Sequence, residues 1–359
     1  MKNILYIIDK PNLYGSELHM LDLVRYYKSK YNISVVAFDN GPLIARLTQL
    51  NIKVNIIHIS WVPSIYAFKQ LIRVVKDFSP NIIHSHQPKA TFYGGVIGLF
   101  LNKKCVSTIH STASDTSKLR GNKITKSIVI LFHYLIQFIS ELLSNKVIFV
   151  SNSSQKNSFF KYKSVVIYNW VNNIQNKSTT KKISSKKVSL LTVGSVSLAK
   201  GFDFLLDFCS KLDANLYRIS IVGDGEHAFV QGIKKRFLEL DLEVEFLGFR
   251  GDPSIYFKRS DVFISLSRSE TFGLAFAEAA SFGLPIFARN LDVLHEILPD
   301  VNYFNNNNEV LIKDLNDLVK NPQLFKQISN TNFEWAKLKY SFEKNIQKLT
   351  NVYKSVESY

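Results

Sequence analysis

The sequence predicts an α/β protein of two domains, each built on a parallel sheet that helices cover on both faces. Short apolar, β-branched segments alternate with longer segments of helical period along the whole chain, which is the pattern of buried parallel strands and their connecting helices. Twelve such strands are too many for one comfortable sheet. A polar, lysine-rich segment at 172–187 separates them into two groups, as an exposed linker does.

The expected strands divide into seven before this linker and five after it. They are Ile4–Asp9, Ile33–Phe38, Val54–Ile59, Asn81–His86, Val106–His110, Lys146–Ser151 and Ser164–Asn169, then Val188–Gly194, Tyr217–Gly223, Glu243–Gly248, Val262–Ser267 and Leu284–Arg289. We therefore expect one Rossmann-like domain over residues 1–171 and a second over 188–341. Apolar residues at helical spacing after Phe342 predict an amphipathic helix over 342–359 that returns toward the N-terminal domain.

Composition bounds the class of protein. The chain has 359 residues, of which 46% are hydrophobic and 21% charged, which favours a globular protein over a disordered one. Cys105 and Cys209 lie far apart in apolar segments, so we expect two core thiols and a reducing, cytoplasmic compartment. The N-terminal segment reads as a first strand and not as a signal peptide. The apolar segment Ser127–Phe138 falls short of a membrane span, and we expect no transmembrane helix.

Charge is distributed unevenly along the chain. Residues 1–190 hold 26 Lys and Arg against 7 Asp and Glu, whereas residues 191–359 hold 19 against 22. A basic half suggests an anionic partner, such as a membrane surface, an acidic substrate or a nucleic acid. A solvated lysine-rich surface that reflects an AT-rich genome explains the excess equally well. No nucleic-acid motif is present, so we expect no nucleic-acid partner.

Ligands of open parallel sheets bind beyond the carboxyl ends of the strands. The first such loop contains Gly15 and Ser16 and opens a helix, where an anion is favoured. The most informative loop follows Ser267. Glu270 stands in that loop and Glu278 in an otherwise apolar helix, eight positions apart, so on one continuous helix they would project from roughly the same side. They are either two structural carboxylates or a pair that meets ligand hydroxyls.

The segment at 267–296 resembles the donor-site signature of the retaining glycosyltransferases of family four, which have the GT-B fold. The matching positions are Ser267, Glu270, Phe272, Gly273, Leu274, Glu278, Gly283 and Pro285. Val193–Gly194, Lys200–Gly201, Ile221–Gly225 and Phe246–Gly248 are similar to further family landmarks, and the first half carries others from Pro80 to Asn169. The resemblance implies two Rossmann-like doubly wound domains that face each other across a cleft, the first for the acceptor and the second for the nucleotide-sugar donor.

The resemblance also implies roles for individual residues. Three are catalytic: Lys200 would neutralise phosphate charge as the leaving group departs, Glu270 would contact hydroxyls of the donor sugar, and His110 would bind that sugar near the reacting carbon. Glu278 would hold the ribose hydroxyls. The remaining donor-binding positions would surround the diphosphate and the base, and they are Gly15, Ser16, Gly194, Ser195, Gly223, Phe249, Arg250, Arg268, Phe272, Gly273 and Leu274.

Two positions depart from the family pattern. The family usually has an arginine where this chain has Ser195, and we expect Arg268 to substitute for it. The family also has a Gly-Gly turn where this chain reads Asp292–Glu296. His84 and His86 alternate on one expected strand and are most simply structural, while His19 reads as an isolated packing or surface residue. No Asp-x-Asp pair follows a strand, and we expect no catalytic metal and no cofactor.

The sequence therefore predicts a metal-independent, retaining hexosyltransferase that moves a sugar from a nucleotide-diphosphate donor to a glycan or lipid-linked glycan. The expected product is a cell-surface polysaccharide such as lipopolysaccharide, O-antigen, capsule or exopolysaccharide. We expect a cytoplasmic protein, and the basic first half is compatible with a peripheral position at the inner face of the membrane. Two alternatives remain open: a nucleotide-sugar epimerase on the same fold, and a catalytically idle glycosyltransferase-like binding protein.

Overall fold

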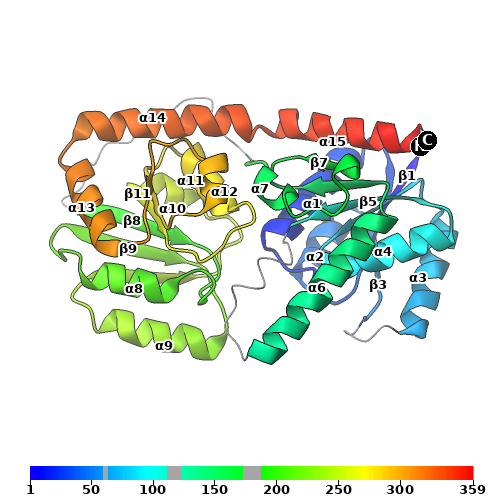
Figure 1. The fold of residues 1–359 in the computed structure, drawn as a ribbon, viewed down its shortest axis with the longest axis horizontal. Coiled ribbons are helices and arrows are strands. Elements are labelled where there is room, and N and C mark those ends of the chain that lie inside the picture. The colour runs from blue at the N-terminus through cyan, green and yellow to red at the C-terminus, as the bar shows by residue number, and fades with distance from the viewer. Residues whose placement is uncertain (60–63, 111–122, 173–186, 359) are drawn as a thin grey trace. The chain divides into compact units, whose positions relative to one another are not determined.

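The protein is described here from a computed structural model, which covers residues 1–59, 64–110, 123–172 and 187–358 (Figure 1). The chain divides into two compact units. Unit 1 contains Met1–Asn169 and Glu343–Tyr359, and unit 2 contains Trp170–Phe342. Nearly all of the expected linker, residues 173–186, lies outside the described residues.

Unit 1 contains a seven-stranded parallel sheet with the order β3-β2-β1-β4-β5-β6-β7. Its strands are β1 (Asn3–Ile8), β2 (Asn32–Ala37), β3 (Lys53–Ile56), β4 (Ile82–His86), β5 (Lys104–Ile109), β6 (Lys146–Phe149) and β7 (Ser164–Val166). Its helices are α1 (Gly15–Tyr27), α2 (Pro42–Gln49), α3 (Ile65–Phe78), α4 (Pro88–Phe100), α6 (Lys123–Leu143), α7 (Asn152–Gln155), the short 3-10 helix η1 (Lys161–Lys163) and α15 (Phe342–Glu357).

Unit 2 contains a six-stranded parallel sheet with the order β10-β9-β8-β11-β12-β13. Its strands are β8 (Val188–Val193), β9 (Tyr217–Val222), β10 (Glu243–Gly248), β11 (Val262–Ser265), β12 (Ile286–Ala288) and β13 (Tyr303–Phe304). Its helices are α8 (Phe202–Ser210), α9 (His227–Leu238), α10 (Ser254–Arg259), α11 (Leu274–Ser281), α12 (Asp292–Ile297), α13 (Asn308–Val319) and α14 (Pro322–Lys339).

Both sheets have the strand order of doubly wound folds, which confirms the predicted fold class. All twelve expected strands form, although several end earlier than expected; β3, for example, stops at Ile56. The edge strand β13 was not expected, because two residues are too few to give a periodic signal. Cys105 and Cys209 are buried free thiols, as predicted, and burial raises the pKa of both.

Helix α4 packs unusually close to its neighbours because three of its inner positions are glycine. A side-chain carbon at Gly94 would collide with Ser85 of β4, one at Gly98 with Cys105 of β5, and one at Gly95 with Leu143 of α6. The glycines therefore let α4 lie between the sheet of unit 1 and α6.

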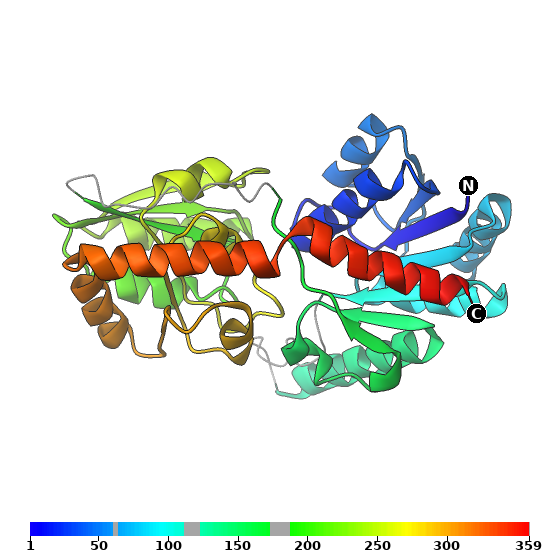
Figure 2. The same cartoon turned by 90° about the horizontal axis from the view of Figure 1, so that it is seen from above.

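The C-terminal helix α15 completes the core of unit 1. It crosses the strands of this unit (Figure 2) and buries Ile346, Leu349 and Tyr353 at the spacing that the sequence predicted. The Tyr353 hydroxyl lies 2.6 Å from Nδ1 of His84 in β4 and 3.1 Å from the hydroxyl of Tyr6 in β1. Residues from the two ends of the chain thus share one buried polar cluster.

Among the described residues, no helix is both long enough and apolar enough to cross a membrane.

Candidate active site

In unit 2, three glycines meet at the carboxyl ends of β8, β9 and β10. The amide of Gly194 donates to the carbonyl of Val222 at 3.0 Å, and the amide of Gly223 donates to the carbonyl of Gly248 at 2.9 Å. Gly223 has a φ of +148°, and a side-chain carbon there would collide with the carbonyl of Gly194. Only glycine fits at Gly223, so the strand ends stay open for a ligand to approach the backbone.

An ion pair joins two of the three predicted catalytic residues. Lys200 Nζ lies 2.6 Å from Glu270 Oε1, and the side chains are 33% and 8% exposed. Lys200 comes from the loop after β8 and Glu270 from the loop after β11, and these two strands are adjacent in the sheet. The carboxylate therefore holds the ammonium group at the strand ends while leaving part of it accessible.

The helix α11 begins directly after this pair. Gly273 occupies its N-cap with a left-handed φ of +79°, and no side chain caps the helix. The first amide groups of an α-helix have no partner within the helix, and the helix dipole makes them attractive to an anion. Residues 270–273 are not helical, so Glu270 lies in the loop and Glu278 in the helix that follows it, as the sequence predicted.

Glu278 lies within α11 and is partly exposed. Desolvation of the Glu278 carboxyl group by burial raises its pKa to about 8, and the negative charge of Asp252 is a second, smaller cause. Within the described part of the chain, its side chain has no hydrogen-bond or ion-pair partner. A carboxylate in a poorly hydrated position without a partner is costly, so ligand hydroxyls would relieve that cost.

Arg268 is already engaged. Its two terminal nitrogens donate to Asp203 Oδ1 and Oδ2 at 2.7 and 2.6 Å, and its guanidinium stacks over Phe204 with Cζ 4.1 Å from the ring centroid. This pairing lowers the pKa of Asp203. A bidentate pair of this kind is strong and offsets the charge of the arginine, so the proposed replacement of the arginine missing at Ser195 does not follow from this geometry.

Arg289 was missed in the sequence analysis. It follows β12, and its guanidinium Cζ also lies 4.1 Å from the centroid of Phe204. In contrast to Arg268, it makes no ion pair with a described residue. Desolvation and the nearby charge of Arg268 lower its pKa.

The remaining predicted positions of unit 2 lie around these groups. Ser195 Oγ is 3.3 Å from Ser197 Oγ. Phe249 and Arg250 follow Gly248 and are exposed, and Phe272 is buried against Tyr340 with ring centroids 5.6 Å apart. Within the described residues, no group of three or more His, Cys, Asp or Glu is arranged to hold a metal ion.

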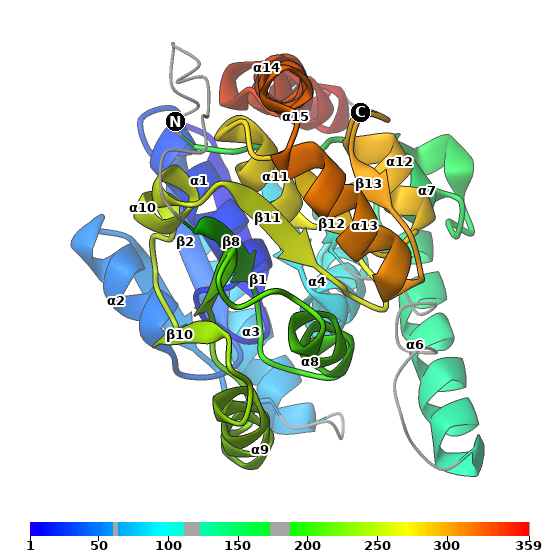
Figure 3. The ribbon, with the colours of Figure 1, turned by 90° about the vertical axis from the view of Figure 1, so that its left-hand side faces the viewer.

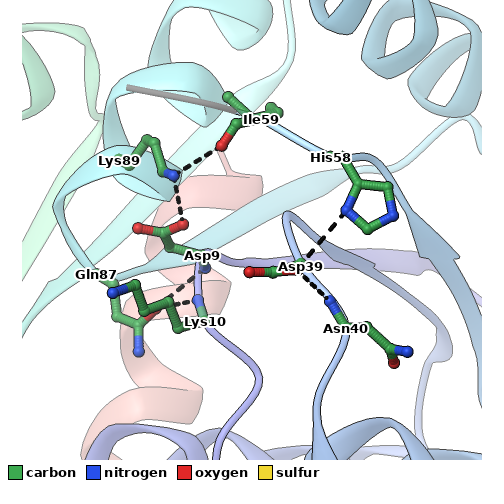
Figure 4. Close-up of polar contacts among 8 residues, drawn as sticks. All are labelled: Asp9, Lys10, Asp39, Asn40, His58, Ile59, Gln87 and Lys89. Carbon is green, nitrogen blue, oxygen red and sulfur yellow. Dashed lines mark hydrogen bonds and ion pairs between the residues drawn. The ribbon is translucent and has the colours of Figure 1, made fainter. Parts of the chain in front are cut away.

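In unit 1, the first turn of α1, which contains Gly15 and Ser16, is tied to the end of β4 by Gln87. The Gln87 amide donates to Ser16 Oγ at 3.2 Å and to Glu17 Oε1 at 2.8 Å, while its carbonyl accepts from the amides of Asp9 and Lys10 (Figure 4). Glu17 is 2% exposed, and burial raises its pKa. The sequence analysis did not select Glu17 or Gln87.

The same edge of unit 1 carries further polar groups after β1, β2, β3 and β4. Lys89 Nζ pairs with Asp9 at 2.8 Å and donates to the carbonyl of Ile59 at 2.9 Å (Figure 4). Asp39 and His58 lie beside them, 3.7 Å apart and largely exposed. This edge thus presents hydrogen-bonding groups of both charge signs.

His110, the third predicted catalytic residue, follows β5 and belongs to a histidine cluster. Its Nε2 lies 3.0 Å from Nδ1 of His86, and its ring contacts that of His19 edge-on, with centroids 5.3 Å apart. Burial lowers the pKa of His110 to about 4, so the imidazole is neutral near pH 7. The expectation that His19 is isolated was wrong, because α1 places it against His86 of β4 and His110 at the end of β5.

Comparison with known proteins follows the same division. The family model described as "Glycosyl transferases group 1" matches residues 173–335, and that of "Glycosyltransferase Family 4" matches residues 14–173. The capsular polysaccharide biosynthesis glycosyltransferase CapH of Staphylococcus aureus is 25% identical over 83% of this chain and 84% of its own length. The O-antigen biosynthesis glycosyltransferase WclY of Escherichia coli is 25% identical over 82% of each chain.

A solved structure has the same fold. Anabaena Alr3699/HepE in complex with UDP-glucose superposes with a TM-score of 0.83 over 99% of this chain and 100% of its own, at 19% identity. Fold and family matches together define this protein as a glycosyltransferase with the GT-B fold. It belongs to the family-four glycosyltransferases, which the two matches cover from residue 14 to residue 335.

Proposed function

We propose that this enzyme transfers a sugar from a nucleotide-diphosphate sugar with retention of the anomeric configuration. The observation that carries the proposal is the arrangement in unit 2, where the Lys200–Glu270 ion pair precedes an uncapped helix that contains the partnerless carboxylate of Glu278. A cation, free amides and a hydroxyl-seeking carboxylate are the groups that a nucleotide diphosphate sugar requires.

Each group has a distinct task. The amides at the start of α11 and the ammonium of Lys200 bind the diphosphate, and Lys200 offsets the charge that grows on it as the C1–oxygen bond breaks. Glu278 accepts hydrogen bonds from the ribose hydroxyls. Glu270 holds Lys200 and accepts from hydroxyls of the donor sugar.

The reaction forms one bond and breaks one. The acceptor hydroxyl oxygen bonds to C1 of the sugar, the bond from C1 to the diphosphate oxygen breaks, and the proton of the acceptor hydroxyl passes to the departing phosphate. Attack on the same face as the leaving group preserves the configuration. We propose that His110 contacts the donor sugar near C1 as a neutral hydrogen-bonding group.

The acceptor that we propose is a growing cell-surface glycan. CapH and WclY are named for capsule and O-antigen biosynthesis, and HepE was crystallised with UDP-glucose, which makes UDP-sugars the first donors to test.

A thermal-shift assay with a panel of UDP-, GDP- and TDP-sugars tests the donor. We expect one of these sugars to raise the melting temperature of the wild type. NMR of the product should then show the donor's anomeric configuration in a new glycosidic bond. An isomerised nucleotide sugar without transfer would support the epimerase, and no shift with any donor would support the idle binding protein.

We also propose that unit 1 docks on an anionic membrane, through a surface formed by α6 and the segment after it. Helix α6, whose course Figure 3 shows, carries Leu131, Leu135, Phe138 and Leu142, which are 70%, 53%, 38% and 46% exposed. Their spacing places an apolar stripe along the helix. Phe159 is 44% exposed and extends this stripe, because its ring packs edge-on against Phe138 with centroids 5.4 Å apart.

The positive charge around this surface favours an anionic bilayer as its binding partner. Residues 123–163 contain six lysines and one acidic residue, Glu141. Glu141 is fully buried and accepts hydrogen bonds from Gln137, Ser158 and the amides of Phe159 and Phe160. The formal charge that this segment shows to solvent is therefore positive, and an apolar stripe with basic flanks is the composition of helices that lie in the membrane interface.

Vesicle sedimentation tests this surface. The wild type should pellet with vesicles that contain phosphatidylglycerol and remain in solution with pure phosphatidylcholine, and high salt should weaken the binding. Leu131→Glu with Leu135→Glu should abolish pelleting, whereas Leu238→Glu, at a site that is 78% exposed in unit 2, should leave it intact. Self-association of the wild type that the double variant loses, without vesicle binding, would instead identify a second copy as the occupant.

A further inference from the structure

We infer that His86 is a positioning residue that fixes the tautomer of His110, so that His110 presents an Nδ1–H donor to the ligand. The inference rests on the proposed function in one respect, since it takes His110 as the residue that meets the donor sugar. The tautomer itself follows from contacts within unit 1.

The first contact is the hydrogen bond between the two imidazoles. Nδ1 of His86 and Nε2 of His110 are 3.0 Å apart, and the rings stack with centroids 5.3 Å apart and an interplanar angle of 23°. Burial lowers the pKa of both rings, so each carries one proton near neutral pH. Exactly one of the two facing nitrogens must then bear hydrogen for the bond to form.

The second observation decides which nitrogen bears it. His86 is fully buried, and its Nε2 has no hydrogen-bond partner within the described structure. A proton on that Nε2 would leave a buried N–H donor without an acceptor, which native structures avoid more strictly than a bare acceptor. The proton of His86 therefore lies on Nδ1 and is donated to His110.

The tautomer of His110 follows. Its Nε2 accepts from His86, so its single proton is on Nδ1. His110 is partly exposed, and its Nδ1 has no hydrogen-bond partner among the described residues. This nitrogen can therefore donate to an oxygen of a bound ligand.

The ring of His86 is held in position by His84, which is itself hydrogen-bonded to two other side chains. The His86 ring packs against that of His84 with centroids 4.4 Å apart and an interplanar angle of 33°. His84 is held by the Tyr353 hydroxyl at 2.6 Å and by Thr108 Oγ1 at 2.8 Å. A series of contacts thus runs from the C-terminal helix to the partly exposed ring of His110, and His86 is its last fully buried member.

The direct test is nitrogen NMR of the wild type labelled with 15N-histidine, without any substrate, with His110→Gln used to assign the resonance. Long-range proton–nitrogen spectra should show His110 with its proton on Nδ1. A proton on Nε2 of His110 would overturn the inference. Because this measurement needs no donor, a protein that shows the Nδ1–H form yet binds no nucleotide sugar would refute the proposed function and leave this inference standing.

A matched pair of variants tests the consequence. Asparagine and leucine have nearly the same size, and only asparagine can replace the Nδ1–H of His86 as a donor. His86→Leu should move the proton of His110 toward Nε2 and lower kcat/KM about tenfold, as expected for one lost hydrogen bond, whereas His86→Asn should stay within about threefold of the wild type. Equal losses in both variants, with an unchanged tautomer of His110, would show that His86 only fills space. If His86→Leu does not fold, the wild-type spectrum and His86→Asn still decide the matter.

Discussion

The candidate site residues at the strand ends of the two units differ in charge. In unit 2 they present a partly exposed ammonium, uncapped helix amides and the partnerless carboxylate of Glu278. In unit 1, His84, His86 and His110 are neutral imidazoles in contact with one another: the rings of His84 and His86 pack together, and His86 is hydrogen-bonded to His110. One doubly wound architecture thus carries charged groups at the strand ends of unit 2 and, at the ends of β4 and β5 in unit 1, a cluster of neutral imidazoles. The contrast supports our proposal that unit 2 stabilises the leaving group while His110 of unit 1 orients uncharged hydroxyls.

The largest effect should come from removing the cation of unit 2. Lys200→Ala should lower kcat by about 100- to 1000-fold, because the departing diphosphate loses its electrostatic partner. Lys211→Ala is the matched control, since Lys211 pairs with Asp207 and Glu309 on the surface of the same unit, and its activity should be unchanged. Equal losses in both variants would contradict a specific role for Lys200.

Protonation of Glu278 should make the stability of the free protein depend on pH. The pKa of about 8 lies above the usual value of 4.5, so the folded state holds this proton more tightly than the unfolded state. The resulting stabilisation is fully present below pH 4.5 and is lost as pH rises to about 8, so that about 3 kcal/mol of it has been lost by pH 7. Urea unfolding of the wild type and of Glu278→Gln between pH 5 and 8 should show this slope in the wild type alone. Parallel slopes would indicate an ordinary carboxylate at Glu278.

The affinity for the nucleotide should depend on a residue of unit 2 and not on a residue of unit 1. Glu278→Ala should weaken binding of the matching nucleoside diphosphate by about 10- to 100-fold, as expected for the loss of one or two hydrogen bonds to the ribose hydroxyls. His110→Gln should leave that affinity within about threefold, because it is proposed to meet the sugar and not the nucleotide. Isothermal titration with the nucleoside diphosphate measures both. A large loss of nucleotide affinity in His110→Gln would contradict the proposal that unit 2 alone binds the nucleotide.

Glycine-to-alanine substitutions in helices should give the smallest effects. They should lower the free energy of unfolding in unit 1 and raise it in unit 2. Gly98→Ala should destabilise unit 1 by about 1–3 kcal/mol, because the new methyl group collides with Cys105. Gly232→Ala in α9 meets nothing within 4 Å, and it should stabilise unit 2 by about 0.5–1 kcal/mol through helix propensity. Chemical denaturation reports both. Destabilisation by Gly232→Ala would show that the space around α9 is not open.

Local patterns predicted most of the fold and part of the candidate site. The buried parallel strands are continuous apolar segments, so their existence was visible in the sequence, as was the loop with Glu270. The pairing of Arg268 with Asp203 joins residues 65 positions apart, and no local pattern signals it. His19 also looked isolated, because only the tertiary packing of α1 places it beside His86 and His110.

The contact of Tyr353 with His84 has a consequence for biosynthesis. Residues 1–169 cannot complete the buried polar cluster of unit 1 until α15 has left the ribosome. At usual elongation rates of about 5–20 residues per second, the intervening chain takes roughly 10–40 s to synthesise. During this interval the nascent first unit holds Tyr6 and His84 without their partner. Unit 2, whose residues are contiguous, can fold first even though it is translated second.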